Sequence, residues 1–318
     1  MAAAPARSSA CVRAHPSRWT GSRCRTAGAR RRPTARTTFT SNDADVAGGG
    51  LYVQDVGSLA IADSTFSENT AARGMGLAVT DVAGGCSLLR VDIAGNAGVG
   101  SSEMWGGAAW LDADCAVTDG AIHENTAPDA VGGGLVVIGH VVVLVGTRVH
   151  DNLAAYGGGV AVATSELGNA SPVTDDASPI DGNRAEIGNA DPFGVGADAL
   201  GGGVLVVSWK TGRIAHVSGL TLTDNQAEGS GGGLAWIDWS HASRLELRSL
   251  TATGNSAGFA GGGLYLYDPT LSTKGGSIVE ISHSTLVGND SDSWGGGIAA
   301  WQLGALALDE SLRSRLSS

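Results

Sequence analysis

The chain has 318 residues, of which 50 are glycine, while only 5% are aromatic and 16% are charged. This glycine content argues against a helical bundle, because each glycine costs a helix about 1 kcal/mol relative to alanine. Collagen is excluded because no glycine recurs at every third position. A hydrophobic content of 42% argues against wholesale disorder. The composition therefore predicts an all-β protein of many short strands joined by tight turns.

The N-terminal segment differs from the rest of the chain in charge. Residues 1–42 hold nine arginines and no acidic residue, whereas eleven basic residues oppose 31 acidic ones from Asp43 onward. Residues 1–38 lack apolar periodicity, which predicts a disordered, low-complexity basic arm. One alternative interpretation is a mitochondrial-type targeting peptide. Another is that this N-terminus is artefactual, so that the true upstream coils and any signal peptide are missing from the sequence.

No segment is apolar enough to predict a span of the membrane. The most apolar stretch, Leu135 to Val145, is interrupted by Gly139 and His140, and it is typical of a buried strand. No apolar run of signal-peptide length follows the arginine-rich start. The acidic body argues against a nucleic-acid partner, and we expect a monomer.

A repeat begins at Phe39 and runs to about Leu308. Its first marker is a glycine triplet followed by an aliphatic residue. The triplets are Gly48–Gly50, Gly132–Gly134, Gly157–Gly159, Gly201–Gly203, Gly231–Gly233, Gly261–Gly263 and Gly295–Gly297, with degenerate copies at 74–76 and 106–108. Sharp corners between strands favour glycine, which tolerates positive φ and close backbone approach.

The second marker is an asparagine that precedes each triplet. The nine copies are Asn42, Asn69, Asn96, Asn125, Asn152, Asn183, Asn225, Asn255 and Asn289, at spacings of 27 to 42 residues. An apolar residue stands three positions earlier in most copies, and an alanine two positions later in seven of nine. Apolar pairs such as Leu59/Ile61 lie further upstream, and this period-2 alternation predicts strands with one buried face.

These units cannot bury their apolar faces singly, but stacked units can. The repeat therefore predicts a right-handed, single-stranded parallel β-helix of about nine coils over residues 39–308, followed by a polar tail over 309–318. At about 4.8 Å per coil, the rod is roughly 43 Å long. We expect the asparagines to adopt the left-handed conformation and to hydrogen-bond one another along a structural ladder.

The motifs resemble those of a known family. Phe39-Thr40-Ser41-Asn42 and Phe66-Ser67-Glu68-Asn69 match the Phe-x-x-Asn half of the repeat of polymorphic outer membrane proteins. The other half, Gly-Gly-Ala followed by Ile, Leu or Val, is present here with a third glycine. More broadly, the chain resembles the pectin-lyase-like β-helix superfamily. The resemblance implies a cell-surface or secreted protein, at the outer membrane or outside the cell, that is often adhesive or antigenic.

Three aromatic residues are candidates for ligand binding. Tyr265, Tyr267 and Trp301 are out of phase with the inward Leu264 and Ile298, so they should face outward. Outward aromatic rings suit sugar rings or a partner protein. The alternative is that they are scattered amphipathic surface residues.

Catalytic candidates lie in or beside the irregular segments, residues 164–179 and 186–200. Asp175, Asp176 and Asp181 form the only acid cluster beside an insertion, and calcium is the cation that such a cluster would hold. Arg184 and Arg213 lie on neighbouring coils. The polygalacturonase-type motifs Asn-Thr-Asp and Gly-His-Gly are absent, so solvated loop acids are the simpler interpretation, and no cofactor is expected.

Two further pairs occupy equivalent positions on adjacent coils. His123-Glu124 and His150-Asp151 predict either a metal site or exposed turn residues. Cys86 and Cys115 each lie ten residues before their asparagine, so their Cα atoms should be about 4.8 Å apart. They form either a disulfide or two buried, reduced thiols.

The observations favour a non-enzymatic β-helix scaffold with an adhesive, structural or ligand-binding role, whose partner is a carbohydrate or a surface protein. The alternative function is a polysaccharide lyase or glycoside hydrolase that acts on acidic polysaccharide. Fold alone does not decide between them, because this architecture hosts many activities.

Overall fold

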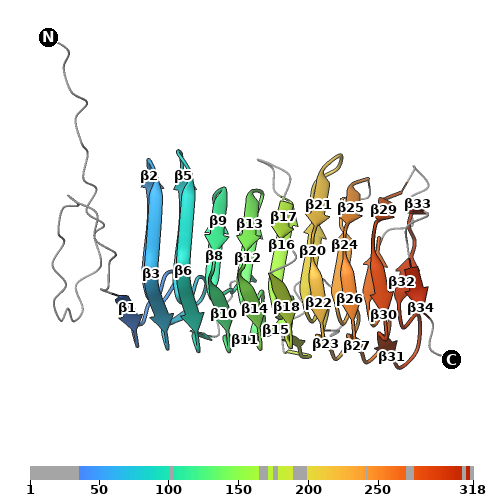
Figure 1. Cartoon of the computed structure of the whole chain (residues 1–318), viewed down its shortest axis with the longest axis horizontal. Helices are drawn as coiled ribbons and strands as arrows, with labels where there is room; N and C mark the ends of the chain where they lie inside the picture. Colours follow the sequence, from blue (N-terminus) through green and yellow to red (C-terminus); the bar gives the residue numbers. More distant parts are fainter. Residues whose placement is uncertain are drawn as a thin grey trace, which may run out of the picture.

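The computed structural model describes residues 36–99, 104–164, 171–174, 178–188, 199–240, 242–269, 276–309 and 313–315. Every regular element within these ranges is a β-strand, and neighbouring strands pair in parallel. The coils stack along one axis, with β1 (Thr37–Thr40) and β34 (Arg313–Arg315) at opposite ends (Figure 1). The predicted all-β parallel β-helix is thus confirmed.

Each coil contributes to three sheets, of nine, seventeen and eight strands. The nine-stranded sheet contains β2 (Leu51–Val56), β5 (Leu77–Val82), β8 (Ala109–Asp112), β12 (Leu135–Ile138), β16 (Val160–Thr164), β20 (Val204–Ser208), β24 (Leu234–Asp238), β28 (Leu264–Tyr267) and β32 (Ile298–Trp301). Eight turns of the chain therefore separate its first strand from its ninth.

The seventeen-stranded sheet has two rows, and β3 (Leu59–Ser67) and β6 (Cys86–Ala94) run through both. The first row continues with β9 (Cys115–Thr118), β13 (Val141–Val145), β17 (Ser171–Thr174), β21 (Ile214–Ser218), β25 (Arg244–Arg248), β29 (Ile278–Ser282) and β33 (Ala305–Leu308). The second row adds β1, β10 (Ala121–His123), β14 (Arg148–His150), β18 (Pro179–Asp181), β22 (Thr221–Thr223), β26 (Thr251–Thr253), β30 (Thr285–Val287) and β34.

The eight-stranded sheet is made of short strands that follow the ladder asparagines. They are β4 (Thr70–Ala71), β7 (Ala97–Gly98), β11 (Thr126–Val131), β15 (Leu153–Tyr156), β19 (Arg184–Ala185), β23 (Gln226–Ala227), β27 (Ser256–Ala257) and β31 (Asp290–Ser291). Its small inward alanines, such as Ala154 and Ala185, are completely buried and in register.

The core is one continuous column of side chains from stacked, equivalent positions. Leu135 pairs with Val160, Val160 with Val204, and Val204 with Leu234, and all are buried. One apolar cluster runs in this way from Phe66 to Leu286. Since each coil is covered by the next, the inward apolar residues of successive units join into one continuous core.

The asparagines form a ladder in which each side chain connects three coils. The side-chain Nδ2 of Asn152 donates to Oδ1 of Asn183 at 2.9 Å and to the backbone oxygen of Ile122 in the preceding coil at 2.9 Å. The Oδ1 of Asn152 accepts from both the backbone N–H and the Nδ2 of Asn125. The same bonds join successive pairs from Asn42 to Asn289. The seven internal amides, from Asn69 to Asn255, are buried with every donor and acceptor used.

The left-handed conformation lies one residue before each asparagine, which corrects the expectation that the asparagine adopts it. Glu68, Glu124, Asp151 and Asp224 have φ between 53° and 55°. Glycine fills the same place in other coils, for example Gly254 with φ 66°. The asparagine is therefore selected for its amide, and its predecessor for backbone geometry.

The three glycines of a corner are required for different reasons. Gly201 has φ 69°. A Cβ on Gly202 would lie 2.3 Å from the backbone oxygen of Gln226, and one on Gly203 would lie 2.6 Å from that of Gly233. The first glycine thus permits the turn, and the other two permit the coils to approach each other.

Strand pairing continues past both predicted boundaries of the repeat, Phe39 and Leu308. The first strand begins at Thr37, two residues before Phe39. At the other end, Arg313–Arg315 pairs in register with β30, so the solenoid continues into the segment assigned to the polar tail. Backbone pairing extends further than the apolar pattern because edge strands need not bury a side chain. The rest of the basic arm, residues 1–35, lies outside the described residues.

Replacing Asn152 by alanine should lower the free energy of unfolding by about 3–5 kcal/mol, because it leaves buried donors of Asn125 without acceptors. Urea unfolding followed by circular dichroism measures the change. Asn42→Ala is the control, since Asn42 is exposed and lies at the end of the ladder. Equal losses in the two variants would show that the interior of the ladder has no special role.

Replacing Asp224 by glycine should stabilise the protein by about 0.5–1 kcal/mol. The left-handed conformation costs a non-glycine residue about 1–2 kcal/mol, and glycine avoids this cost. Glycine also raises the entropy of the unfolded chain, which cancels part of the gain. Thr223→Gly, in the adjoining strand, should instead destabilise it by about 0.5–1 kcal/mol. Thermal unfolding compares the two variants, and a lower Tm for Asp224→Gly would contradict the conformational argument.

Candidate ligand-binding surface

The outer face of the nine-stranded sheet carries a second apolar layer. Its members include the outward residues Val136, Leu205 and Ile237, which are completely buried. The segment before each glycine corner folds back over this face, so that a Cβ on Gly132 would lie 2.3 Å from the Val136 side chain. Strands β16, β20 and β24 are consequently buried on both faces.

The layer ends at the last coils in a cluster of five aromatic residues, which we call the aromatic patch: Phe259, Tyr265, Tyr267, Trp294 and Trp301. The ring centroids of Trp294 and Trp301 are 5.5 Å apart with nearly perpendicular planes, and those of Phe259 and Trp294 are 5.2 Å apart. Tyr265 lies 5.3 Å from Trp301 and 5.9 Å from Tyr267. Edge-to-face packing of this kind holds the rings in fixed orientations.

The exposed part of the patch differs from the part that was predicted. Tyr265, Tyr267 and Trp301 point away from the core as expected, but Tyr265 is only 8% exposed because its neighbours cover it. The exposed rings are Trp294 (57%) and Phe259 (38%). A usable signal was present in the sequence, because Trp294 directly precedes a glycine corner, where residues fold back onto the outer face.

Two exposed carboxylates, Asp290 and Asp292, lie within four residues of Trp294 in the sequence. Asp292 is exposed in a turn that is closed by a hydrogen bond from the Ser291 hydroxyl to the backbone oxygen of Trp294 at 3.0 Å. Asp290 is exposed in β31, and its backbone N–H donates to the backbone oxygen of Asn255. The patch therefore combines apolar ring surface with negative charge.

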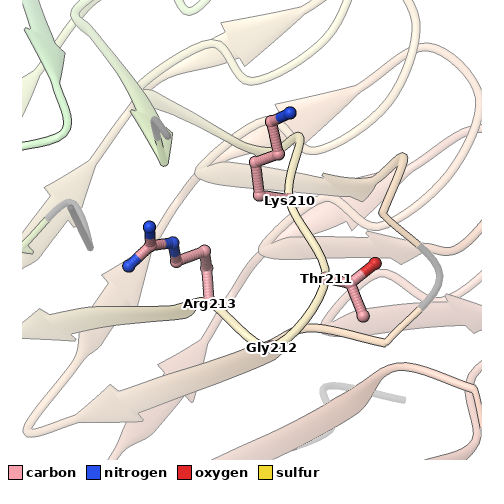
Figure 2. A pocket seen from close by; sticks show the side chains of 4 residues that line it. All are labelled: Lys210, Thr211, Gly212 and Arg213. Carbon is pink, nitrogen blue, oxygen red and sulfur yellow. The ribbon is translucent and has the colours of Figure 1, made fainter. Parts of the chain in front are cut away.

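Two tryptophans continue the aromatic surface toward the middle of the rod. Trp209 and Trp239 come from adjacent coils and stack with centroids 6.4 Å apart. Directly after Trp209, the turn Lys210–Arg213 lines an open hollow of about 490 Å³. The charged ends of Lys210 and Arg213 lie apart from each other (Figure 2), so they do not converge on one point.

The predicted catalytic acids do not form a described cluster. Asp181 accepts two hydrogen bonds from the Arg148 guanidinium, with Nε to Oδ1 at 2.8 Å, and this raises the pKa of Arg148. Arg184 pairs with Glu186 at 3.0 Å. Asp175 and Asp176 lie outside the described residues, as do most of the irregular segments around them.

His123 and His150 stack on each other. The rings of His123 and His150 are parallel with centroids 4.8 Å apart. His123 contacts Asp92 at 3.1 Å, and His150 contacts Asp151 at 2.7 Å. Among the described residues, no group of three or more His, Cys, Asp or Glu side chains could hold a metal ion.

Charged side chains also lie on the outer face of the nine-stranded sheet near its first coils. The Arg73 guanidinium lies over the Trp110 ring, 5.3 Å from its centroid. In the same strand as Trp110, burial raises the pKa of Asp112, while His140 at 3.3 Å opposes this effect. An arginine-on-tryptophan contact is thus present on this face.

A buried polar cluster that no sequence motif predicted lies in the loops after β24 and β28. Asp238 and Asp268, both completely buried, lie 2.5 and 2.6 Å from the same Ser277 hydroxyl. Asp238 also accepts from the backbone N–H groups of Ser240 and Ser243. These bonds hold the loops that follow β24 and β28, so the cluster is structural.

The cysteines lie where the repeat places them. Cys86 and Cys115 are in-register partners of β6 and β9, with Cα atoms 4.4 Å apart, and they form a disulfide. Both are buried, and the bond joins two adjacent coils.

Replacing both cysteines by alanine should lower the free energy of unfolding by roughly 3–4 kcal/mol, because the bond closes a loop with a sequence separation of 29. Guanidinium unfolding with and without reductant measures this. The wild-type protein should respond to reductant and the double variant should not. A wild-type midpoint that is unchanged by reductant would contradict the prediction.

This chain matches no known family, no curated protein and no solved structure. In the described ranges, no helix is long and apolar enough to cross a membrane.

Proposed function

We propose that the protein is a cell-surface or secreted β-helix scaffold that binds a ligand through its aromatic patch. The observation that carries this proposal is the exposure of Trp294 and Phe259 within a packed five-ring cluster. Large apolar rings are usually buried when they serve only the fold. A contiguous exposed aromatic surface is typical of a binding site.

The scaffold supports binding by holding these rings in place. Tyr265, Tyr267 and Trp301 belong to β28 and β32, which pair in register. Trp294 is tied to the preceding coil by a parallel bridge to Ala260. A ligand therefore meets rings that are already ordered, and binding loses little side-chain entropy.

Location outside the cytoplasm is supported by the disulfide between Cys86 and Cys115. Disulfides persist in oxidising compartments and are rare in the cytosol. The resemblance of the Phe-x-x-Asn and Gly-Gly-Gly motifs to surface-protein repeats points the same way. A carbohydrate is the ligand class that we favour, since flat sugar rings stack on exposed indole and phenyl faces.

Affinity electrophoresis through gels that contain neutral polysaccharides tests the proposal. The wild-type protein should be retarded by at least one of them, and Trp294→Ala should weaken this binding by about tenfold through the loss of one stacking contact. Tyr52→Ala is the matched control, because Tyr52 is 37% exposed on β2, at the other end of the same sheet.

Two results would contradict the proposal. One is retardation that Tyr52→Ala and Trp294→Ala reduce equally. The other is release of unsaturated uronate from polygalacturonate by the wild-type protein but not by Asp181→Ala, which would establish the lyase alternative.

A further inference from the structure

We infer that the aromatic patch has an occupant within the chain itself, namely the arginine-rich residues 1–35. This inference uses the binding surface of the proposed function and adds a competitor for it. The partner chemistry is a cationic polypeptide that places guanidinium groups on exposed aromatic rings beside carboxylates.

Charge is the first argument. Residues 1–35 contain eight arginines and no acidic residue, whereas residues 36–318 contain twelve basic and 31 acidic residues. The two parts of the chain therefore attract each other at moderate ionic strength, where the screening length is about 8–10 Å.

The chemistry of the patch selects arginine. Guanidinium groups stack on aromatic faces, and tryptophan is the best partner for them. The contact of Arg73 with Trp110 shows this arrangement on the same outer face of the nine-stranded sheet. Trp294 offers a larger exposed ring, since it is 57% exposed whereas Trp110 is 7% exposed.

The carboxylates beside the patch are not engaged in ion pairs with described residues, in contrast to several other acids of the solenoid. Asp63 is paired with Arg90, which holds its pKa below the ordinary value, and Asp181 is paired with Arg148. Asp290 and Asp292 have no basic partner among the described residues. Other exposed carboxylates, such as Asp55, are also unpaired within the described part of the chain. Asp290 and Asp292, however, lie within four residues of Trp294, so an incoming arginine can meet negative charge and an exposed indole together.

The geometry permits contact within one molecule. A chain of 35 residues spans at most about 115–125 Å. The stacked strands of the solenoid extend about 38 Å from first to ninth, at 4.8 Å per step. Strand β1, which follows residues 1–35 in the sequence, lies at the end opposite β31 and β32 (Figure 1), and a segment of this length has the reach to extend along the rod.

Photo-crosslinking in the full chain tests the inference. A benzophenone amino acid is placed at Phe259 in one protein and at Tyr52 in a second, because these rings are 38% and 37% exposed. Mass spectrometry should find crosslinks from position 259 to residues 1–35, at several-fold higher yield than from position 52. The comparison is stringent because position 52 is in the first coil, next to the segment.

Substitutions within the position-259 protein identify the chemistry. Trp294→Ala, or Asp290→Asn together with Asp292→Asn, should each lower the crosslink yield by about two- to fivefold. Salt at 1 M should lower it similarly, because the screening length falls to about 3 Å. Asp55→Asn, which changes an exposed carboxylate in the first coil, should leave it unchanged.

Equal yields from positions 52 and 259, no crosslink from position 259, or insensitivity to Trp294→Ala would each overturn the inference. The outcome is separable from the proposed function. Replacement of the eight arginines by glutamine should strengthen polysaccharide binding if the segment competes, and should leave it unaltered if only the inference fails.

Discussion

The hydrogen bonds of the ladder asparagines are the interactions on which the rest of the structure depends. Each internal amide bonds to the coil before it and to the coil after it, as Asn152 does with Ile122 and Asn183. The register of every sheet follows from this, because the asparagines align the coils whatever their length. The longest coil, between Asn183 and Asn225, keeps the same bond at 3.0 Å. The extra length of this coil therefore does not shift the ladder.

In-register stacking multiplies each local feature along the rod. A glycine corner places the preceding residue over the outer face of the nine-stranded sheet, and repetition of the corner builds the second apolar layer. This outer layer ends at the last coils, where Trp294 and Phe259 remain exposed. The binding surface thus arises from the same geometry that builds the core, at the place where its repetition stops.

Buried polar groups follow the same rule. The amides of the ladder and the carboxylates of Asp238 and Asp268 are buried with hydrogen-bonding partners. A buried polar group without a partner is destabilising, so these groups tie the fold to one arrangement of corners and loops. The ion pairs on the exposed faces, such as Arg148 with Asp181, contribute less because water screens them.

The sequence by itself determined the coil, its register and the residues that stack. The spacing of asparagines and glycines places Cys86 beside Cys115 and His123 beside His150, because identical positions of successive coils must align. Which residue turns left-handed, and which rings stay exposed, was decided only in three dimensions. Glu68 and Asp224 take the left-handed place because the neighbouring amide must point inward. Phe259 and Trp294 join Tyr265 and Trp301 because the chain folds back over the outer face, and a period-2 pattern carries no information about what covers a strand from outside.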